Sequence, residues 1–376
     1  MGDVKKNRDT GIELLRIIGA LMVIGTHIAL DPMAGGAPSR ARILVSCLVS
    51  DGVAIFFFIC GFFLFAGKAG YDARLKKLCT RILVPLLLYS VFSFFFYGII
   101  SGEASSLSES FRHTSEDMKN IFISLLKWQN AIPGAGHMWY LYVYSILIFV
   151  FPALKGIRDL AVSSRNGYKI LLVVLFLLLV INDLTFNGLF GFSHHAFNGC
   201  MAAAILVFFG DAMGRKREQI RGDRSAFFLG LLMFVGGVVL RSCIQYQCYL
   251  LDNPTNEPLF WYTSYSVVTV TGISLMVLAI KFSGPDGLLS RIISHLGKLT
   301  FPVYIVHEMC MFFFNHRGIK EIILSHTGDN GIGVFLYEAA YVLLIFVTAS
   351  LISEVIIFIK NSVIIKTFKS IKKGER

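Results

Sequence analysis

The chain alternates between long apolar runs and short polar segments over almost its whole length. A helix needs about 20 apolar residues to cross a bilayer, and ten runs approach that length. They are residues 11–30, 43–66, 82–100, 138–154, 168–187, 199–214, 226–246, 261–282, 298–315 and 333–359. The pattern predicts an all-α, polytopic membrane protein with about ten transmembrane helices.

The distribution of Lys and Arg supports this division of the chain. One set of alternate connecting segments holds 26 basic residues, whereas the opposite set holds seven. Because Lys and Arg are retained on the cytoplasmic side of membrane proteins, this bias places both termini in the cytoplasm. We therefore expect a single integral-membrane domain over residues 1–376, with a helical core at about 11–360 and a basic cytoplasmic tail at 361–376.

Composition excludes other classes of protein. Hydrophobic residues make up 55% of the 376 residues and the mean hydropathy is +0.67, more apolar surface than a soluble chain of this length could bury. The net charge of +11 lies in short loops, which indicates contact with the lipid bilayer and not with nucleic acid. The seven cysteines form no CxxC pair, which favours packing thiols over disulfides or metal ligands.

The first apolar run, GIELLRIIGALMVIGTHIAL, carries two groups that a membrane helix normally avoids, Arg16 and His27. Eleven residues return to within about 20° of the same helix face and rise about 16 Å. An ionisable side chain inside a membrane is costly and usually serves a site. The structural alternative is an Arg that snorkels to the headgroups and a His that is hydrogen-bonded within the bundle.

Three later segments complete a family resemblance. The Arg and His of the first run are followed by FFFICGFF (56–63), GHMWYLYVYSILIFVFPAL (136–154) and GKLTFPVYIVHE (297–308). In this order they resemble the bacterial acyltransferase family 3, in its stand-alone form. Its members are membrane enzymes that O-acylate surface polysaccharides, lipopolysaccharide, peptidoglycan and related glycans, which implies a location in the bacterial cytoplasmic membrane.

The resemblance implies transfer of an acyl group, expected to be acetyl, from cytoplasmic acyl-CoA to a hydroxyl of a cell-surface or lipid-linked glycan. His27 is the expected general base, because a neutral imidazole can take a hydroxyl proton; a transient acyl carrier is the alternative role. Arg16 would orient the donor or stabilise negative charge. Acetyl-CoA is then a co-substrate, and no metal or permanently bound cofactor is expected.

Two further residues are candidates for binding the substrates. Arg81 precedes the proline of the third run in RILVP, where a guanidinium could bind the donor's phosphates; the alternative is a simple positive-inside anchor. Trp139 begins the fourth run. It is either a depth anchor at the membrane interface or a ring on which a sugar stacks.

Three more residues are expected to support the site or bind the acceptor. His137 follows the PGAG turn that leads into the fourth run. Tyr304 and His307 are three residues apart in the ninth run and therefore share a helix face. We expect this face to point into the bundle. Arg241, near the end of the seventh run, has Asp252 and Glu257 in the next loop as candidate structural partners.

Two other functions are compatible with a helical bundle of this kind. One is a polysaccharide exporter or flippase, although no pair of interrupted helices occupies corresponding positions in two halves of the chain, as in many transporters. The other is a non-catalytic sensor or scaffold in a capsule-synthesis complex. The expected partners are acyl-CoA, a glycan acceptor, the lipid bilayer and polysaccharide-synthesis proteins.

Overall fold

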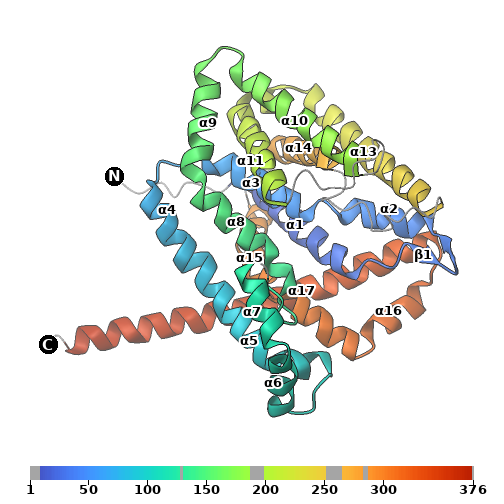
Figure 1. Cartoon of the computed structure of the whole chain (residues 1–376), viewed down its shortest axis with the longest axis vertical. Coiled ribbons are helices and arrows are strands. Elements are labelled where there is room, and N and C mark those ends of the chain that lie inside the picture. The colour runs from blue at the N-terminus through green and yellow to red at the C-terminus, as the bar shows by residue number, and fades with distance from the viewer. Residues whose placement is uncertain (1–8, 128–129, 187–198, 251–264, 283–286, 375–376) are drawn as a thin grey trace.

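The computed structural model describes residues 9–127, 130–186, 199–250, 265–282 and 287–374, and these residues are overwhelmingly helical (Figure 1). The first half contains α1 (Thr10–Ile28), α2 (Arg40–Val49), α3 (Gly52–Leu64), α4 (Tyr71–Leu78), the π-helix η1 (Cys79–Leu83), α5 (Val84–Ser101), α6 (Leu107–Glu116), α7 (Met118–Leu126), the 3-10 helix η2 (Gly136–Met138), α8 (Trp139–Phe149), α9 (Phe151–Ser163) and α10 (Gly167–Phe186). The second half contains α11 (Gly199–Arg215), α12 (Arg217–Gly222), α13 (Ser225–Leu250), α14 (Tyr265–Lys281), α15 (Leu288–His316), α16 (Ile319–Thr327) and α17 (Gly331–Gly374). Two short strands, β1 (Met33–Ala34) and β2 (Ala37–Pro38), pair antiparallel between α1 and α2.

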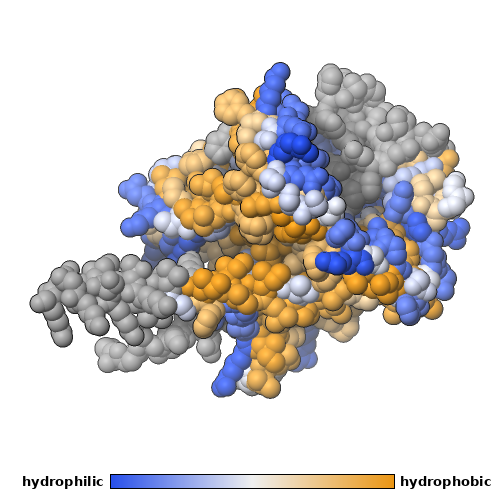
Figure 2. Space-filling model, turned by 90° about the horizontal axis from the view of Figure 1, so that it is seen from below, coloured by the Kyte–Doolittle hydropathy of each residue, from blue (hydrophilic) through white to orange (hydrophobic). Residues whose placement is uncertain are grey.

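The all-α prediction is confirmed for the described residues, and five helical segments are long and apolar enough to cross a membrane. They are Thr10–Ile28, Arg40–Leu64, Tyr71–Ser101, Ser225–Leu250 and Gly331–Ile359. The bent pair of α8 and α9 makes a sixth if it counts as one span. Figure 2 shows hydrophobic residues in the centre of one face, with hydrophilic residues toward its edges. The chain is a membrane protein; ten spans and cytoplasmic termini stay predictions.

Helix α1 lies between two clusters of buried hydrophobic side chains. Ile12, Leu15 and Met22 belong to a first cluster, which α1 shares mainly with α3, α11 and α14. Ile17 and Ile24 belong to a second cluster, shared mainly with α5, α15 and α17. Because apolar residues on two sides of α1 are buried in different cores, the helix has a fixed rotation and depth within the protein.

The start of α1 is fixed by Asp9. Its carboxylate accepts hydrogen bonds from the backbone N–H groups of the first helical turn, at Gly11 and Ile12. The same carboxylate binds the guanidinium groups of Arg217 and Arg221. A capping carboxylate satisfies N–H groups that have no partner within the helix, and here it also ties α1 to α12.

The backbones of helices α3 and α11 come into direct contact at two glycines, Gly61 of α3 and Gly210 of α11. A Cβ atom at Gly61 would lie 2.0 Å from the carbonyl oxygen of Val207, and one at Gly210 would lie 2.1 Å from that of Phe58. The glycine of FFFICGFF is therefore needed for close packing of these two helices. All seven cysteines are free thiols, and Cys60 is partly buried beside Gly61.

Three predicted helices are less regular than their apolar runs suggested. The second run is divided into α2 and α3 at Ser50 and Asp51. The fourth bends by 62° between α8 and α9, where Pro152 lies in the first turn of α9. The third contains η1, because Pro85 has no N–H to donate to the carbonyl of Arg81.

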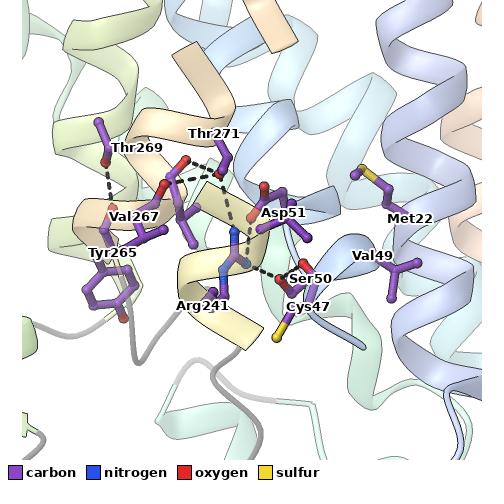
Figure 3. Close-up of polar contacts among 12 residues, drawn as sticks. Met22, Cys47, Val49, Ser50, Asp51, Arg241, Tyr265, Val267, Thr269 and Thr271 are labelled. Carbon is purple, nitrogen blue, oxygen red and sulfur yellow. Dashed lines mark hydrogen bonds and ion pairs between the residues drawn. The ribbon is translucent and has the colours of Figure 1, made fainter. Parts of the chain in front are cut away.

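A fully buried ion pair lies at the break between α2 and α3 (Figure 3). Arg241 of α13 and Asp51 each have 0% of their side-chain surface exposed, and Nη1 lies 2.9 Å from Oδ1. Arg241 also donates to the hydroxyls of Ser50 and, at 3.3 Å, Thr271. The partners suggested by the sequence, at 252 and 257, lie outside the described residues. A cation so far from water requires the carboxylate, and the pair joins α13 to α3 and α14.

We predict that Arg241→Met destabilises the protein by about 3–5 kcal/mol, because it leaves the Asp51 carboxylate buried without a counter-ion. Thermal and denaturant unfolding in detergent micelles would measure the loss. The matched control is Arg224→Met, an exposed cation before α13, for which we expect a change within about 0.5 kcal/mol. The double variant Arg241→Met/Asp51→Asn should recover most of the loss; equal instability of the single and double variants would refute the ion-pair explanation.

Candidate functional site

Helix α1 brings Arg16 to an internal pocket. Arg16 Nη1 donates to Glu13 Oε1 over 2.8 Å, and the Glu13 side chain is only 5% exposed. On its other side the guanidinium lies 5.6 Å from the ring centre of Phe63. A carboxylate one turn earlier and an aromatic ring thus hold Arg16. This arrangement differs from the snorkelling alternative, because Arg16 is bound to a buried partner.

The pocket that Arg16 lines has a volume of about 460 Å³. Its lining comes from α1, α3, α4, α8 and α15, and includes three cations and several aromatic rings. The lining residues are Arg16, Phe56, Ile59, Cys60, Phe63, Leu64, Arg74, Tyr140, Tyr144, Gly297, Lys298, Thr300, Phe301 and Tyr304. A concave, mostly apolar site with a few polar groups is typical of a binding site for a small molecule.

Arg74 and Lys298 give the pocket a second and a third positive charge. The Arg74 guanidinium donates to the carbonyl oxygens of Gly67 and Ala69, and it lies 4.2 Å from the ring centre of Phe151. These contacts fix Arg74 in place, whereas Lys298 is exposed. Arg16, Arg74 and Lys298 come from three different helices, and together they suit an anionic ligand.

Three histidines from distant parts of the chain form a cluster. The ring centres of His27 and His307 are 5.3 Å apart, those of His137 and His307 are 4.9 Å apart, and those of His27 and His137 are 6.4 Å apart. His137 and His307 are buried, whereas His27 is exposed. In the part of the chain that the structure describes, no group of three or more His, Cys, Asp or Glu side chains could hold a metal ion.

Both ring nitrogens of His137 have hydrogen-bond partners. Nδ1 lies 2.6 Å from Glu308 Oε2, and Nε2 lies 3.2 Å from the carbonyl oxygen of Ile305. Since a carbonyl oxygen only accepts, Nε2 carries a hydrogen, and a further proton lies between Nδ1 and the Glu308 carboxylate. The Tyr304 hydroxyl donates to the backbone carbonyl of His137. His137 is therefore held at its ring and at its backbone.

The PGAG turn before η2 is anchored to α5. The Tyr89 hydroxyl donates to the carbonyl of Gly134, and the Ser93 hydroxyl donates to the carbonyl of Pro133. Gly134 has a φ of +70°, and a Cβ atom there would lie 2.7 Å from the Tyr97 ring. Only glycine adopts this conformation easily, so the turn requires Gly134 to place His137 in the cluster.

Tyr304 connects the pocket to the histidine cluster. It lines the pocket, and its ring centre lies 5.4 Å from that of His137 and 5.9 Å from that of His307. Tyr140, also in the lining, has its ring centre 5.7 Å from that of Tyr304. Tyr304 therefore belongs both to the pocket lining and to the surroundings of the histidine cluster.

The structure brings five of the seven residues selected from the sequence to this site: Arg16, His27, His137, Tyr304 and His307. Arg81 is exposed in η1 and does not line the pocket. Trp139 is partly buried and packs against the first hydrophobic cluster. Neither residue therefore contributes to the pocket lining.

Four residues at or near the pocket and the cluster were not selected as site residues from the sequence: Glu13, Arg74, Lys298 and Glu308. Glu13 could have been found, because an acid three residues before Arg16 on a helix is a standard ion-pair spacing. Glu308 follows His307 directly, but its partner His137 lies 171 positions earlier in the chain. Arg74 and Lys298 were included among the basic residues of the connecting segments, and only their tertiary positions distinguish them.

We predict that Gly134→Ala destabilises the protein by about 1–3 kcal/mol, because Ala is strained at positive φ and its methyl group would overlap the Tyr97 ring. Unfolding in detergent measures the change. Gly156→Ala is the matched control, since Gly156 is helical and has open space around its Cβ position; it should be neutral or stabilising by up to about 1 kcal/mol. Equal effects of both changes would contradict this role of the turn.

Comparison with known proteins identifies the family of the chain. The family model described as an acyltransferase domain, that of acyltransferase family 3, matches residues 9–354. No curated protein and no solved structure gives a significant match to the chain. The matched residues include the whole pocket and the histidine cluster, so the chain belongs to acyltransferase family 3 and is a membrane acyltransferase.

Proposed function

We propose that this acyltransferase moves an acetyl group from acetyl-CoA, bound from the cytoplasmic side of the bacterial plasma membrane, to a hydroxyl of a cell-surface or lipid-linked glycan. One observation carries the proposal: a pocket with three cations meets a cluster of three histidines at Tyr304. The cations suit the phosphates of the donor, and the imidazoles suit removal of a hydroxyl proton.

The pocket has the properties expected of a donor site. Its volume of about 460 Å³ is within the usual range of about 300–1,000 Å³ for ligand pockets. Arg74 and Lys298 would bind phosphate oxygens. Arg16, which already has a carboxylate partner in Glu13, would direct its remaining N–H groups toward the donor. The aromatic walls would surround the pantetheine arm and keep water from the thioester.

His27 is positioned to act as the general base. It lies eleven residues after Arg16, about 16 Å further along α1, and its side chain is exposed, in contrast to those of His137 and His307. His27 would take the proton of the acceptor hydroxyl as the oxygen forms a C–O bond to the thioester carbon. The C–S bond then breaks, and the sulfur of the departing CoA takes the proton from His27, so the imidazole ends neutral.

The acceptor class rests on the family resemblance, since the chemistry itself requires only a hydroxyl. Polysaccharide-synthesis proteins are the proposed partners, because they would supply the acceptor glycan to the site. The exporter alternative requires translocation without acetyl transfer. An assay of both activities on the same preparation therefore separates the two functions.

We predict that His27→Ala lowers acetyl transfer by about 10²–10⁴-fold, the usual contribution of a general base. Purified protein in proteoliposomes is given radiolabelled acetyl-CoA and glycan, and Arg16→Ala should also lose transfer. The matched control is His326→Ala, an exposed histidine on α16, which should keep wild-type activity. Translocation of a lipid-linked glycan by all the proteins without any acetyl transfer would establish the exporter function instead.

We predict that Arg74→Ala and Lys298→Ala each raise the KM for acetyl-CoA about tenfold and leave kcat within about twofold. A hydrogen bond to a charged group contributes about 1.5–3 kcal/mol, and 1.4 kcal/mol is a factor of ten in binding. Steady-state kinetics would measure both constants. Lys77→Ala, at an exposed position on α4 outside the pocket lining, is the matched control. Arg81→Ala should behave like this control; a KM increase as large as that of Arg74→Ala would identify Arg81 as a donor ligand.

A further inference from the structure

His307 is held in one orientation with one ring nitrogen unused. Its side chain is buried in α15, and Nδ1 lies 2.8 Å from the carbonyl oxygen of Tyr304. Because a carbonyl oxygen only accepts, Nδ1 carries the hydrogen of the neutral ring, and Nε2 keeps a bare lone pair. Nε2 is buried and has no hydrogen-bond partner among the described residues. A buried acceptor without a donor is unusual and requires an explanation.

Most of the polar groups around Nε2 are already engaged. His137 uses Nδ1 with Glu308 and Nε2 with the carbonyl of Ile305. The Tyr304 hydroxyl donates to the carbonyl of His137, and the Tyr89 hydroxyl donates to that of Gly134. These fixed contacts leave no side-chain N–H or O–H group of His137, Tyr304 or Tyr89 for Nε2 of His307.

His27 is the remaining neighbour with an available N–H. Its ring centre is 5.3 Å from that of His307, the two rings are inclined by 46°, and no hydrogen bond holds His27 within the described residues. The side chain is exposed, so it can turn about its side-chain torsions. The 5.3 Å between the ring centres is short enough for an N–H of His27 to reach the lone pair of His307 after rotation about these torsions.

We propose that His307 is a positioning residue that accepts a hydrogen bond from His27 and thereby fixes which nitrogen of His27 carries the hydrogen. This inference rests on the proposed function, in which His27 is the base. The second nitrogen of His27 then keeps its lone pair and faces the acceptor hydroxyl. A base that a third group orients is a common feature of nucleophilic catalysis, and the partner of one ring nitrogen sets the role of the other.

The same hydrogen bond stabilises His27 after it takes the proton. Both nitrogens of the His27 imidazolium then carry hydrogens, and one stays bonded to the lone pair of His307. The proton comes from the acceptor hydroxyl and leaves on the sulfur of CoA, so His307 neither gains nor loses a proton.

Two substitutions of His307 separate positioning from a general structural role. His307→Leu removes the acceptor, and kcat for acetyl transfer should fall at least about 100-fold while the KM for acetyl-CoA stays within about twofold. His307→Gln can donate to the Tyr304 carbonyl through its amide nitrogen and accept from His27 through its oxygen, so it should keep kcat within about tenfold. Equal losses in both variants, or wild-type kcat in His307→Leu, would overturn the proposal.

A second measurement needs no catalytic turnover. In ¹⁵N-histidine NMR of the purified protein in nanodiscs, the His27 signals, assigned by their absence in His27→Gln, should report a single neutral tautomer. In His307→Leu they should report a mixture of tautomers, and in the control His316→Leu, an exposed position at the end of α15, they should be unchanged. A single tautomer in wild type and His307→Leu alike would overturn the proposal. Loss of the single tautomer in His307→Leu, in a protein that does not transfer acetyl groups, would sustain the proposal while the proposed function fails.

Discussion

Paired ionisable groups inside this protein fix how several of its helices pack, because a charge in an apolar interior is costly without a partner. Arg241 has Asp51, Arg16 has Glu13 and His137 has Glu308. Each pair joins a different set of helices, or holds a side chain at a fixed place on one helix. His27 is the exception among the described residues of the cluster, with no hydrogen bond of its own. An imidazole left without a hydrogen bond among paired ionisable groups is a candidate for chemistry.

Helix α1 holds Arg16 and His27 at a fixed separation. Its apolar residues belong to two separate hydrophobic clusters, and Asp9 fixes its first turn. The helix can therefore neither rotate nor slide without disturbing both clusters. Arg16 and His27 are eleven residues apart on this rigid element, so their separation of about 16 Å is set by the helical rise. The length of a donor that contacts both residues is fixed in turn by the helix, and not by flexible loops.

Periodicity and composition predicted much of this structure, because the apolar spans and the spacing of Arg16 and His27 are local properties of the sequence. The break at Ser50 and Asp51 was not foreseen. Ser50, Asp51 and Gly52 do interrupt the second apolar run, but local sequence gives no sign that Asp51 pairs with an arginine nearly 200 residues away. Local sequence was equally unable to identify which cations line the pocket. Arg81 was selected from its place before a proline, yet the π-turn leaves it outside the pocket, whereas Arg74 lines it from α4. Local pattern identifies a cation near the site, but packing decides which cation reaches it.

The proposed reaction places a chemical requirement on the site. A thioester exposed to water near a general base would be hydrolysed instead of transferred, so under the proposed function the base would meet the donor in a place with little water. Aromatic rings of α3, α8 and α15 line the pocket between the cations and the imidazoles, and Tyr304 forms the boundary while it also supports the backbone of His137. Tyr304 therefore contributes both to the pocket wall and to the position of His137. Because its hydroxyl donates to the His137 carbonyl, a displacement of Tyr304 would also disturb the turn that carries His137.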